Sequence, residues 1–242
     1  MNLLIRCSSL GKIMTEAQSI DPSLLDDNTR PLVKSKKRTD EQDEILRKLR
    51  DKSLSVGAKT YLTDLAKQGV YGYQTEITSK YMEKGLMVEN EAIELYNEVH
   101  FESLSKNTER REDDYITGEC DLIIPGRKGI DVKSSWSLDT FPVLSEDCHE
   151  QIYEWQARGY MRLWDVPEWE IAYCMVSTPE ELLGAFEQPE LHSVDHIPKN
   201  MRITSIHYKR DMALEERIVE KCAAAQAFYT DAVRRILATH GA

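Results

Sequence analysis

The chain of 242 residues is 41% hydrophobic and 30% charged, and its formal net charge at pH 7 is −11. No apolar run approaches the ~18 residues that a membrane span requires, and the first residues are too few for a signal peptide. With neither a Pro/Gly/Ser-rich linker nor an internal repeat, the sequence predicts a single cytoplasmic domain over residues 1–242.

The charges are unevenly distributed along the chain. A strongly negative protein is not a typical nucleic-acid binder, because such binders usually carry a basic excess. The segment 30–38, however, holds five basic residues and no acidic residue. We interpret it either as a solvated, mobile loop or as a lid that contacts DNA, since an acidic exterior can have a local basic lining.

The cysteines are odd in number, widely spaced and never in a C-x-x-C pair. This spacing predicts neither a zinc site nor an iron–sulfur cluster, and it fits reduced thiols in a cytoplasm. The five positions are Cys7, Cys120, Cys148, Cys174 and Cys222.

In the first half of the chain the patterns predict helices. Residues 1–14 should form a short extended piece and a helix that Ser8 or Ser9 caps, and residues 17–40 a loop rich in turn signals. Further helices are expected from Thr39 onward, over Val56–Gln68 and over Ser79–His100.

The last of these helices carries one unusual residue. Met82, Leu86, Glu89, Ile93 and Tyr96 recur at helical spacing, so Glu89 would place a carboxylate on an otherwise apolar face. A buried, unpaired carboxylate is costly and should have a cation or a proton. Alternatively, the stripe is rotated and Glu89 lies at its solvated edge.

The second half alternates strands with helices. This order predicts an α/β architecture, in which a mixed central β-sheet is flanked by helices. The predicted strands are Leu104–Arg110 (weak), Tyr115–Ile124, Gly129–Ser135, Trp169–Ser177 and Met201–Lys209. The predicted helices are Ser145–Trp164, a short one from Pro179, and Met212–His240.

The most informative stretch joins two of these strands. Residues i and i+2 of a strand share a face, so Asp131 and Lys133 point the same way. For Asp121 to face Asp131, the hairpin needs an odd-numbered loop or a bulge, and a three-residue loop over 125–127 would supply it. A two-residue turn without a bulge would separate the aspartates.

Two carboxylates that face each other across a hairpin lie ~4–5 Å apart and repel each other unless a cation lies between them. Hard oxygen ligands favour Mg²⁺ or Mn²⁺, and a second ion bound through Glu89 would complete a two-metal site for phosphoryl displacement. Lys133 could then orient or deprotonate water and offset charge on phosphorus. The alternative is that Asp131 and Lys133 belong to the exposed face of a strand, which carries a cross-strand ion pair.

The segments Gly118–Asp121 and Gly129–Lys133 resemble the D…(D/E)-x-K signature of the restriction-endonuclease-like nuclease superfamily. More specifically, the chain resembles the phage lambda exonuclease group of alkaline exonucleases, which includes YqaJ-type recombinases. Three further segments agree in order and spacing, and the match runs from residue 6 to about residue 177. They are Arg6–Met14, Gly85–Ala92 and Tyr153–Met161.

The resemblance implies a restriction-endonuclease-like core with a magnesium-dependent site. Lys133 would be the catalytic lysine in it. The implied metal ligands are Glu89, Asp121, Asp131 and the backbone carbonyl of Val132. Asp131 stands where many relatives carry glutamate, which shortens this ligand by one methylene.

It also implies a set of DNA-contacting residues, namely Arg6, Ser8, Ser9, Lys12, Gln156 and Tyr160. Ser8 and Ser9 could bind a 5′-phosphate at a helix N-terminus or could simply cap the helix. Gln156 and Tyr160 share a helical face with Tyr153, which fits either a supporting or DNA-facing role or an aromatic core stripe. Arg6 lies nearer to the serines than the family's phosphate-binding arginine.

In function, the resemblance implies a 5′→3′ exonuclease that uses two Mg²⁺ (or Mn²⁺) ions and digests one strand of linear double-stranded DNA. It further implies phage-type homologous recombination in a bacterial host, a single-strand annealing partner and a trimeric ring around DNA. Two alternatives remain open: an endonuclease or structure-specific resolvase of the same superfamily, and a DNA-binding recombination protein with a degenerate site.

Overall fold

The computed structural model describes residues 3–75 and 79–241 and divides the chain into two compact units. The first, called the helical unit, comprises Met1–Thr75, Glu112–Thr117 and Asp211–Ala242. The second, called the sheet unit, comprises Glu76–Arg111 and Gly118–Arg210. The expectation that residues 1–242 fold as one domain stays a prediction.

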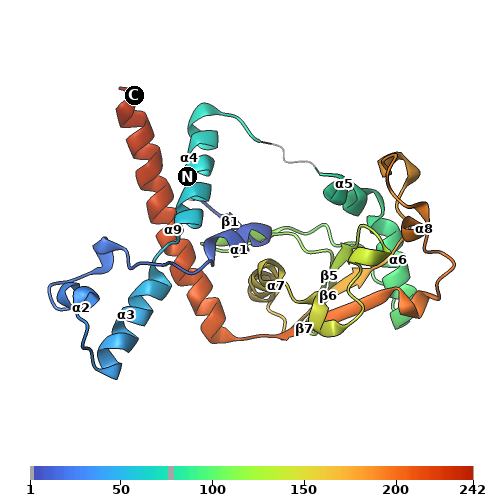
Figure 1. The fold of residues 1–242 in the computed structure, drawn as a ribbon, viewed down its shortest axis with the longest axis horizontal. Helices are drawn as coiled ribbons and strands as arrows, with labels where there is room; N and C mark the ends of the chain where they lie inside the picture. The colour runs from blue at the N-terminus through green and yellow to red at the C-terminus, as the bar shows by residue number, and fades with distance from the viewer. Residues whose placement is uncertain (1–2, 76–78, 242) are drawn as a thin grey trace. The chain divides into compact units, whose positions relative to one another are not determined.

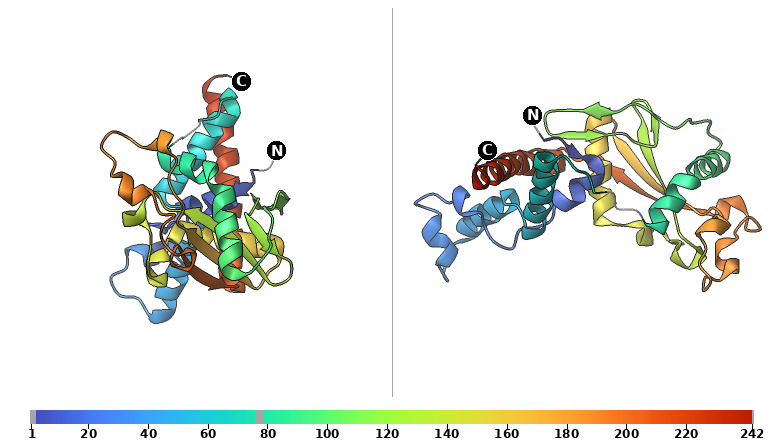
Figure 2. Two further views of the ribbon diagram at one scale, coloured as in Figure 1. Left: turned by 90° about the vertical axis from the view of Figure 1, so that its right-hand side faces the viewer. Right: turned by 90° about the horizontal axis from the view of Figure 1, so that it is seen from above.

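In the helical unit, the long helix α9 (Met212–Thr239) lies beside α4 (Val56–Tyr71), and the short α1 (Leu10–Ile13) packs against both (Figures 1 and 2). Burial of apolar side chains on these helices provides the core of the unit. Its members include Leu10, Ile13, Ala58, Leu62, Ala66, Ile218, Cys222 and Ala225.

Local capping explains where the helices of this unit begin and end. Thr39 forms a capping box with Gln42 at the start of α3 (Asp40–Lys52), as its position predicts. Helix α4 ends at Gly72, whose φ of 67° is the left-handed conformation that glycine adopts at helix ends. The predicted 17–40 loop contains a short helix, α2 (Arg30–Lys34).

The sheet unit is built on four strands in the order β4-β5-β6-β7. Strands β5 and β6 are parallel and the two outer pairs are antiparallel, so the predicted mixed central sheet is confirmed. The strands are β4 (Leu122–Ile124), β5 (Lys128–Ser134), β6 (Glu168–Cys174) and β7 (Ile203–Lys209).

Each face of this sheet is covered by one long helix. Helix α6 (Glu89–His100) covers the face that presents Ile130 and Ala172, and together they form one apolar core. Helix α7 (Gln151–Trp164) covers the other face, where Tyr160 stacks near Trp169 with ring centroids 5.1 Å apart. The predicted arrangement of helices on both sides of the sheet is confirmed.

A second, three-stranded sheet has the order β1-β3-β2. It breaks the predicted strand Tyr115–Ile124 in two, because β3 (Ile116–Gly118) pairs with β1 (Ile5–Arg6) whereas β4 pairs with β5. The weak strand prediction over 104–110 is wrong, since strand structure there begins only with β2 (Arg111–Glu112).

The predicted helix Ser79–His100 is also two helices. Helix α5 (Lys80–Met87) ends at Val88, where φ is −103° and ψ is 11°, and α6 starts at Glu89. The predicted apolar stripe is wrong for α5, because Leu86 is 76% exposed. Glu89 therefore lies at the start of a helix and not in the middle of a buried face. At this position the helix dipole stabilises its carboxylate.

The remaining elements are short or shifted relative to prediction. The helix predicted from Ser145 is a 3-10 turn over Ser145–Cys148 followed by α7, and residues beyond Pro179 form a 3-10 turn and α8 (Pro189–His192). All five cysteines are buried, and they form no disulfide within the described residues. No helix among residues 3–75 and 79–241 has both the length and the apolarity needed to cross a membrane.

Candidate active site

The hairpin between β4 and β5 has the three-residue loop that the sequence requires. Leu122 pairs with Ile130 and Ile124 with Lys128, which leaves 125–127 as the loop. Gly126 has a φ of 69°, the left-handed conformation expected in such loops. Extending the register by one residue places Asp121 opposite Asp131, so the condition that both aspartates share a face is met.

The two aspartates form a tightly packed acidic pair. Asp131 is 3% exposed and forms an ion pair with the Lys133 ammonium. One carboxylate oxygen of Asp121 accepts a hydrogen bond of 2.7 Å from the backbone N–H of Val132. Burial and the neighbouring Asp131 charge raise the pKa of Asp121 well above its usual range.

Neighbouring segments fix the backbone that carries Asp121. The Asn107 backbone N–H donates to the Asp121 carbonyl at 2.7 Å, and its side-chain amide donates to the Cys120 carbonyl at 3.1 Å. On the other side, the Tyr160 hydroxyl donates to the Glu119 carbonyl at 2.9 Å. The backbone at the start of the hairpin is therefore held through three successive carbonyls, those of Glu119, Cys120 and Asp121.

Tyr160 and Gln156 were expected to support the site or to face DNA. Both are buried, and the Gln156 amide donates to the Tyr160 hydroxyl at 3.3 Å. Through Tyr160 this pair reaches the backbone that precedes Asp121, which favours the supporting interpretation. Their assignment as DNA contacts stays a prediction.

These residues line one cavity of about 430 Å³ in the sheet unit. Helices α5, α6 and α7 and strands β5 and β6 all contribute to its wall. The lining residues are Tyr81, Met82, Gly85, Leu86, Glu89, Asp121, Asp131, Val132, Lys133, Ser134, Tyr153, Gln156, Tyr160 and Tyr173. The cavity thus unites all the sequence-predicted residues of the sheet unit.

Glu89 lines this cavity but its carboxylate is engaged elsewhere. It forms an ion pair with Lys106, whose neighbour Asn107 is bound to the hairpin. Accordingly, no group of three His, Cys, Asp or Glu side chains among residues 3–75 and 79–241 is close enough to hold a metal ion. The role of Glu89 as a third ligand stays a prediction.

The two aspartates nevertheless fit a divalent cation. Both are carboxylates, the hard oxygen donors that Mg²⁺ and Mn²⁺ prefer. Lys133 offsets part of their mutual repulsion, and burial together with the neighbouring Asp131 charge still raises the pKa of Asp121. A cation bound by Asp121, Asp131 and the Val132 carbonyl would remove this cost.

Lys133 has two further neighbours that the sequence did not assign to the site. Its ammonium lies 4.6 Å from the ring centroid of Tyr153, and Tyr173 is its partner in the β5–β6 register. Burial disfavours the lysine charge, but Asp131 and Asp121 outweigh this effect and raise the pKa of Lys133. The helical spacing of Tyr153 from Tyr160 was the only sequence signal for this contact.

A buried lysine attaches α5 to the segments that follow the two parallel strands. Lys84 is fully buried, and its ammonium donates to the carbonyls of Ser135, Trp136 and Val176 at 2.5, 3.0 and 3.0 Å. Burial lowers the pKa of Lys84 to about 8. No sequence pattern points to this lysine, because its acceptors lie 51 to 92 residues away.

The predicted residues near the N-terminus belong to the helical unit. Arg6, Ser8 and Lys12 are exposed, and the Lys12 ammonium lies 4.8 Å from the Tyr61 ring centroid. Ser9 is the N-cap of α1 but makes no side-chain capping hydrogen bond, so simple capping does not explain it. A substrate-binding role for these four residues stays a prediction.

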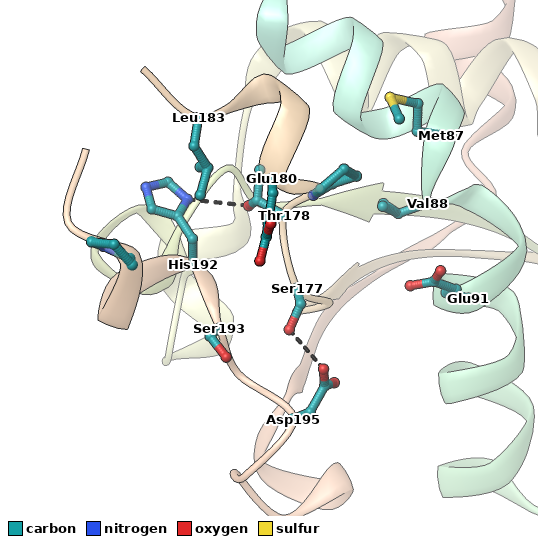
Figure 3. A pocket seen from close by; sticks show the side chains of 12 residues that line it. Met87, Val88, Glu91, Ser177, Thr178, Glu180, Leu183, His192, Ser193 and Asp195 are labelled. Carbon is teal, nitrogen blue, oxygen red and sulfur yellow. Dashed lines mark hydrogen bonds between the residues drawn. The ribbon is translucent and has the colours of Figure 1, made fainter. Parts of the chain in front are cut away.

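The sheet unit contains a second cavity, of about 500 Å³, which Figure 3 shows from close by. Glu91, Glu180 and Asp195 contribute carboxylates, and the Ser177 hydroxyl donates to Asp195 at 2.9 Å. The described residues that line it include neither lysine nor arginine. Phosphate would be repelled there, which distinguishes it from the cavity of Lys133.

No family model and no curated protein matches the sequence. Among solved structures, a phage-related exonuclease from Haemophilus somnus 129PT is 31% identical, with a TM-score of 0.80 over 98% of this chain and 97% of that chain. An alkaline exonuclease from Laribacter hongkongensis, solved alone and in complex with dAMP, shares the fold at 14% identity. Its TM-scores are 0.65 and 0.62 over 98% of this chain and 93% of that chain.

The 31% identity extends over nearly the full length of both chains, and the fold carries the acidic hairpin that the superfamily signature predicts. The chain therefore belongs to the phage lambda exonuclease and YqaJ-type family of alkaline exonucleases, and it is a nuclease of this family.

Proposed function

We propose that this nuclease is a Mg²⁺-dependent 5′→3′ exonuclease that digests one strand of linear double-stranded DNA in phage-type homologous recombination. The observation that carries the proposal is the juxtaposition of Asp121, Asp131 and Lys133 in one cavity. Two neighbouring carboxylates with one lysine are suited to hold divalent cations and a phosphodiester together.

In this proposal each residue has a defined task. Asp121 and Asp131 hold the cations, with the carbonyl of Val132 beside them and Glu89 as a further ligand. Lys133 orients water against the scissile phosphate and offsets the negative charge that develops there. Water adds to phosphorus as the bond to the 3′ oxygen breaks, and a 5′-mononucleotide leaves.

The bound Mg²⁺ would stabilise negative charge on the phosphate and lower the pKa of the attacking water. For Glu89 to act as a ligand, its ion pair with Lys106 has to open. The resulting product class is a deoxynucleoside monophosphate, and the L. hongkongensis enzyme has been solved with such a molecule, dAMP.

The direction of digestion is tested with linear duplexes labelled at one 5′ end or at one 3′ end. In Mg²⁺, the 5′ label should be released as mononucleotide from the first turnovers, whereas the 3′ label should stay on long single strands. Early release of the 3′ label would contradict the 5′→3′ direction.

Closed circular duplex DNA separates an exonuclease from an endonuclease. The proposed enzyme should leave such circles intact and degrade the same plasmid after linearisation. If closed circles are nicked or linearised at a comparable rate, the endonuclease or resolvase alternative replaces the proposal.

We also propose that the active form is a trimeric ring around DNA that hands its single-stranded product to an annealing protein. A ring would reconcile a net charge of −11 with DNA binding, because only the channel needs to be basic. Sedimentation should give three times the chain mass of 27.9 kDa. A monomer at working concentrations would contradict the ring.

A further inference from the structure

The ammonium of Lys133 has two partners that attract it in different ways. It forms the ion pair with Asp131, and it lies 4.6 Å from the ring centroid of Tyr153. An ammonium within about 6 Å of an aromatic ring is attracted by the negative face of the ring. The first partner comes from the same strand, the second from helix α7.

These two partners respond differently to a bound cation. If Asp131 is a metal ligand, as in the proposed function, its negative charge is shared with the metal and attracts Lys133 less strongly. An aromatic ring is no ligand for Mg²⁺, which prefers oxygen donors. The attraction of Tyr153 for Lys133 therefore persists when the metal is bound.

We propose that Tyr153 is a positioning residue of the nuclease, whose ring keeps the Lys133 ammonium directed at the substrate phosphate once Asp131 has bound metal. This inference rests on the proposed function. A carboxylate in place of the ring would be drawn to the metal or would neutralise the lysine. The ring holds the ammonium and leaves its charge available.

The fold fixes this ring with respect to the sheet. Tyr153 is in the first turn of α7 and is half-buried in the wall of the cavity. Further along α7, Tyr160 contacts Trp169 on β6 and donates to the Glu119 carbonyl. Lys133 lies on β5, and Tyr160 attaches α7 to the neighbouring β6, so the fold holds the ring and the ammonium on facing elements.

The Tyr153 hydroxyl makes no hydrogen bond to the part of the chain that the structure describes. A Tyr153→Phe variant therefore keeps the ring and loses no hydrogen bond to the described residues. Tyr153→Leu removes the ring while keeping an apolar side chain. The pair separates the role of the ring from that of the hydroxyl.

A matched control exists on the same helix. The guanidinium of Arg158 lies 5.8 Å from the ring centroid of Tyr208, which does not line the catalytic cavity. Tyr208→Leu thus removes a cation–ring contact from α7, together with the 3.0 Å hydrogen bond between the Tyr208 hydroxyl and His149, without touching the cavity of Lys133. It reports how much activity is lost through a general weakening of the helix.

The kinetic test uses the full chain with saturating Mg²⁺ and linear duplex. Tyr153→Leu should lower kcat about tenfold, with KM for DNA changed less than about twofold, whereas Tyr153→Phe and Tyr208→Leu should stay within about twofold of the parent enzyme. Equal losses for Phe and Leu, or a Leu variant with unchanged kcat, would overturn the proposal.

A spectroscopic test does not depend on catalysis. In protein labelled with ¹³C-lysine, the Lys133 ε-CH₂ protons should be shifted upfield by the ring and identified by their loss in Lys133→Arg. The shift should persist with Mg²⁺ and in Tyr153→Phe and vanish in Tyr153→Leu. If adding Mg²⁺ moves the Lys133 signal to the position of exposed lysines, the proposal for Tyr153 is overturned. If the parent enzyme does not hydrolyse DNA, the proposed function is overturned instead.

Discussion

The central sheet carries a carboxylate–lysine contact on each of its two faces. The two contacts differ in how far hydrogen bonds and opposite charge compensate the burial of the carboxylates. On the α6 face, Glu170 is 1% exposed and accepts hydrogen bonds from Lys128 at 2.6 Å, Tyr96 at 2.8 Å and Ser205 at 2.8 Å. Burial alone would raise the pKa of Glu170, but these donors lower it.

On the α7 face, two carboxylates share one lysine. Asp121 and Asp131 face each other across the hairpin, and Lys133 is the cation that offsets both. Here burial and like charge dominate, so the pKa of Asp121 is raised. The Glu170 network, whose charges are compensated, joins α6 to the sheet. The Asp121 and Asp131 pair, which is compensated only in part, opens into a cavity and is suited to bind a further cation.

The largest difference should appear when one carboxylate on each face is neutralised. Asp131→Asn removes a proposed metal ligand and should lower Mg²⁺-dependent hydrolysis about 10³-fold, the size of loss caused by deleting one transition-state-stabilising group. Without metal it should unfold at the same or higher urea concentration, because a repulsion is relieved. Hydrolysis near the parent rate would show that Asp131 is not in the active site.

Glu170→Gln should have the opposite profile. It leaves Lys128 without its carboxylate in a largely buried position, so we expect a loss of about 3 kcal/mol in the free energy of unfolding, measured with urea. The folded fraction should still hydrolyse DNA at the parent rate per active molecule. A loss below about 1 kcal/mol would show that the hydrogen bonds of Glu170 stabilise the fold no more than the contacts of Asp131 do.

The pH dependence of stability should distinguish the faces as well. Because the pKa of Asp121 is raised in the folded state, the folded protein holds this proton when the unfolded chain has lost it. Stability of the metal-free protein should thus fall as pH rises above 3.8, the usual value, with a contribution of at most about 1.4 kcal/mol per pH unit. Urea unfolding from pH 5 to 8 should show this slope reduced in Asp121→Asn, and parallel curves would contradict the assignment.

A smaller effect is expected for the hydrogen bond that supports the acidic hairpin from α7. Tyr160→Phe removes the hydrogen bond to the Glu119 carbonyl and should destabilise the protein by about 1 kcal/mol. Because that carbonyl lies two residues before Asp121, Mg²⁺ affinity should fall a few-fold, as measured by calorimetry. If Mg²⁺ affinity is unchanged, Tyr160 contributes only to packing.

From the sequence we could state the condition under which Asp121 and Asp131 share a face, because the register of the acidic hairpin depends on local turn chemistry, and the structure meets this condition. A three-residue loop with a left-handed Gly126 is specified by neighbouring residues, and it alone decides whether Asp121 faces Asp131. The mixed sheet followed from the order of strands and helices in the same way.

Features that depend on distant contacts could not be predicted. The break at Val88 lies inside an uninterrupted helical pattern, and the buried Val88 side chain packs into the core that α6 forms with the sheet. The roles of Lys84 and Lys106 could not be predicted either. Their partners come from other segments of the chain, which meet these lysines only in the folded protein. The predicted strand Tyr115–Ile124 is two strands in the structure, because its first part pairs with β1 in one sheet and its last part with β5 in the other.

The central claim is that the incompletely satisfied face of the sheet is a divalent-cation site. Its most direct test is anomalous diffraction from a crystal of the protein soaked with Mn²⁺. A manganese peak within ligand distance of the Asp121 and Asp131 carboxylates, absent from crystals of Asp131→Asn, is the predicted result. A fully occupied peak elsewhere in the molecule, with Lys133 still the only cation beside the two aspartates, would contradict it.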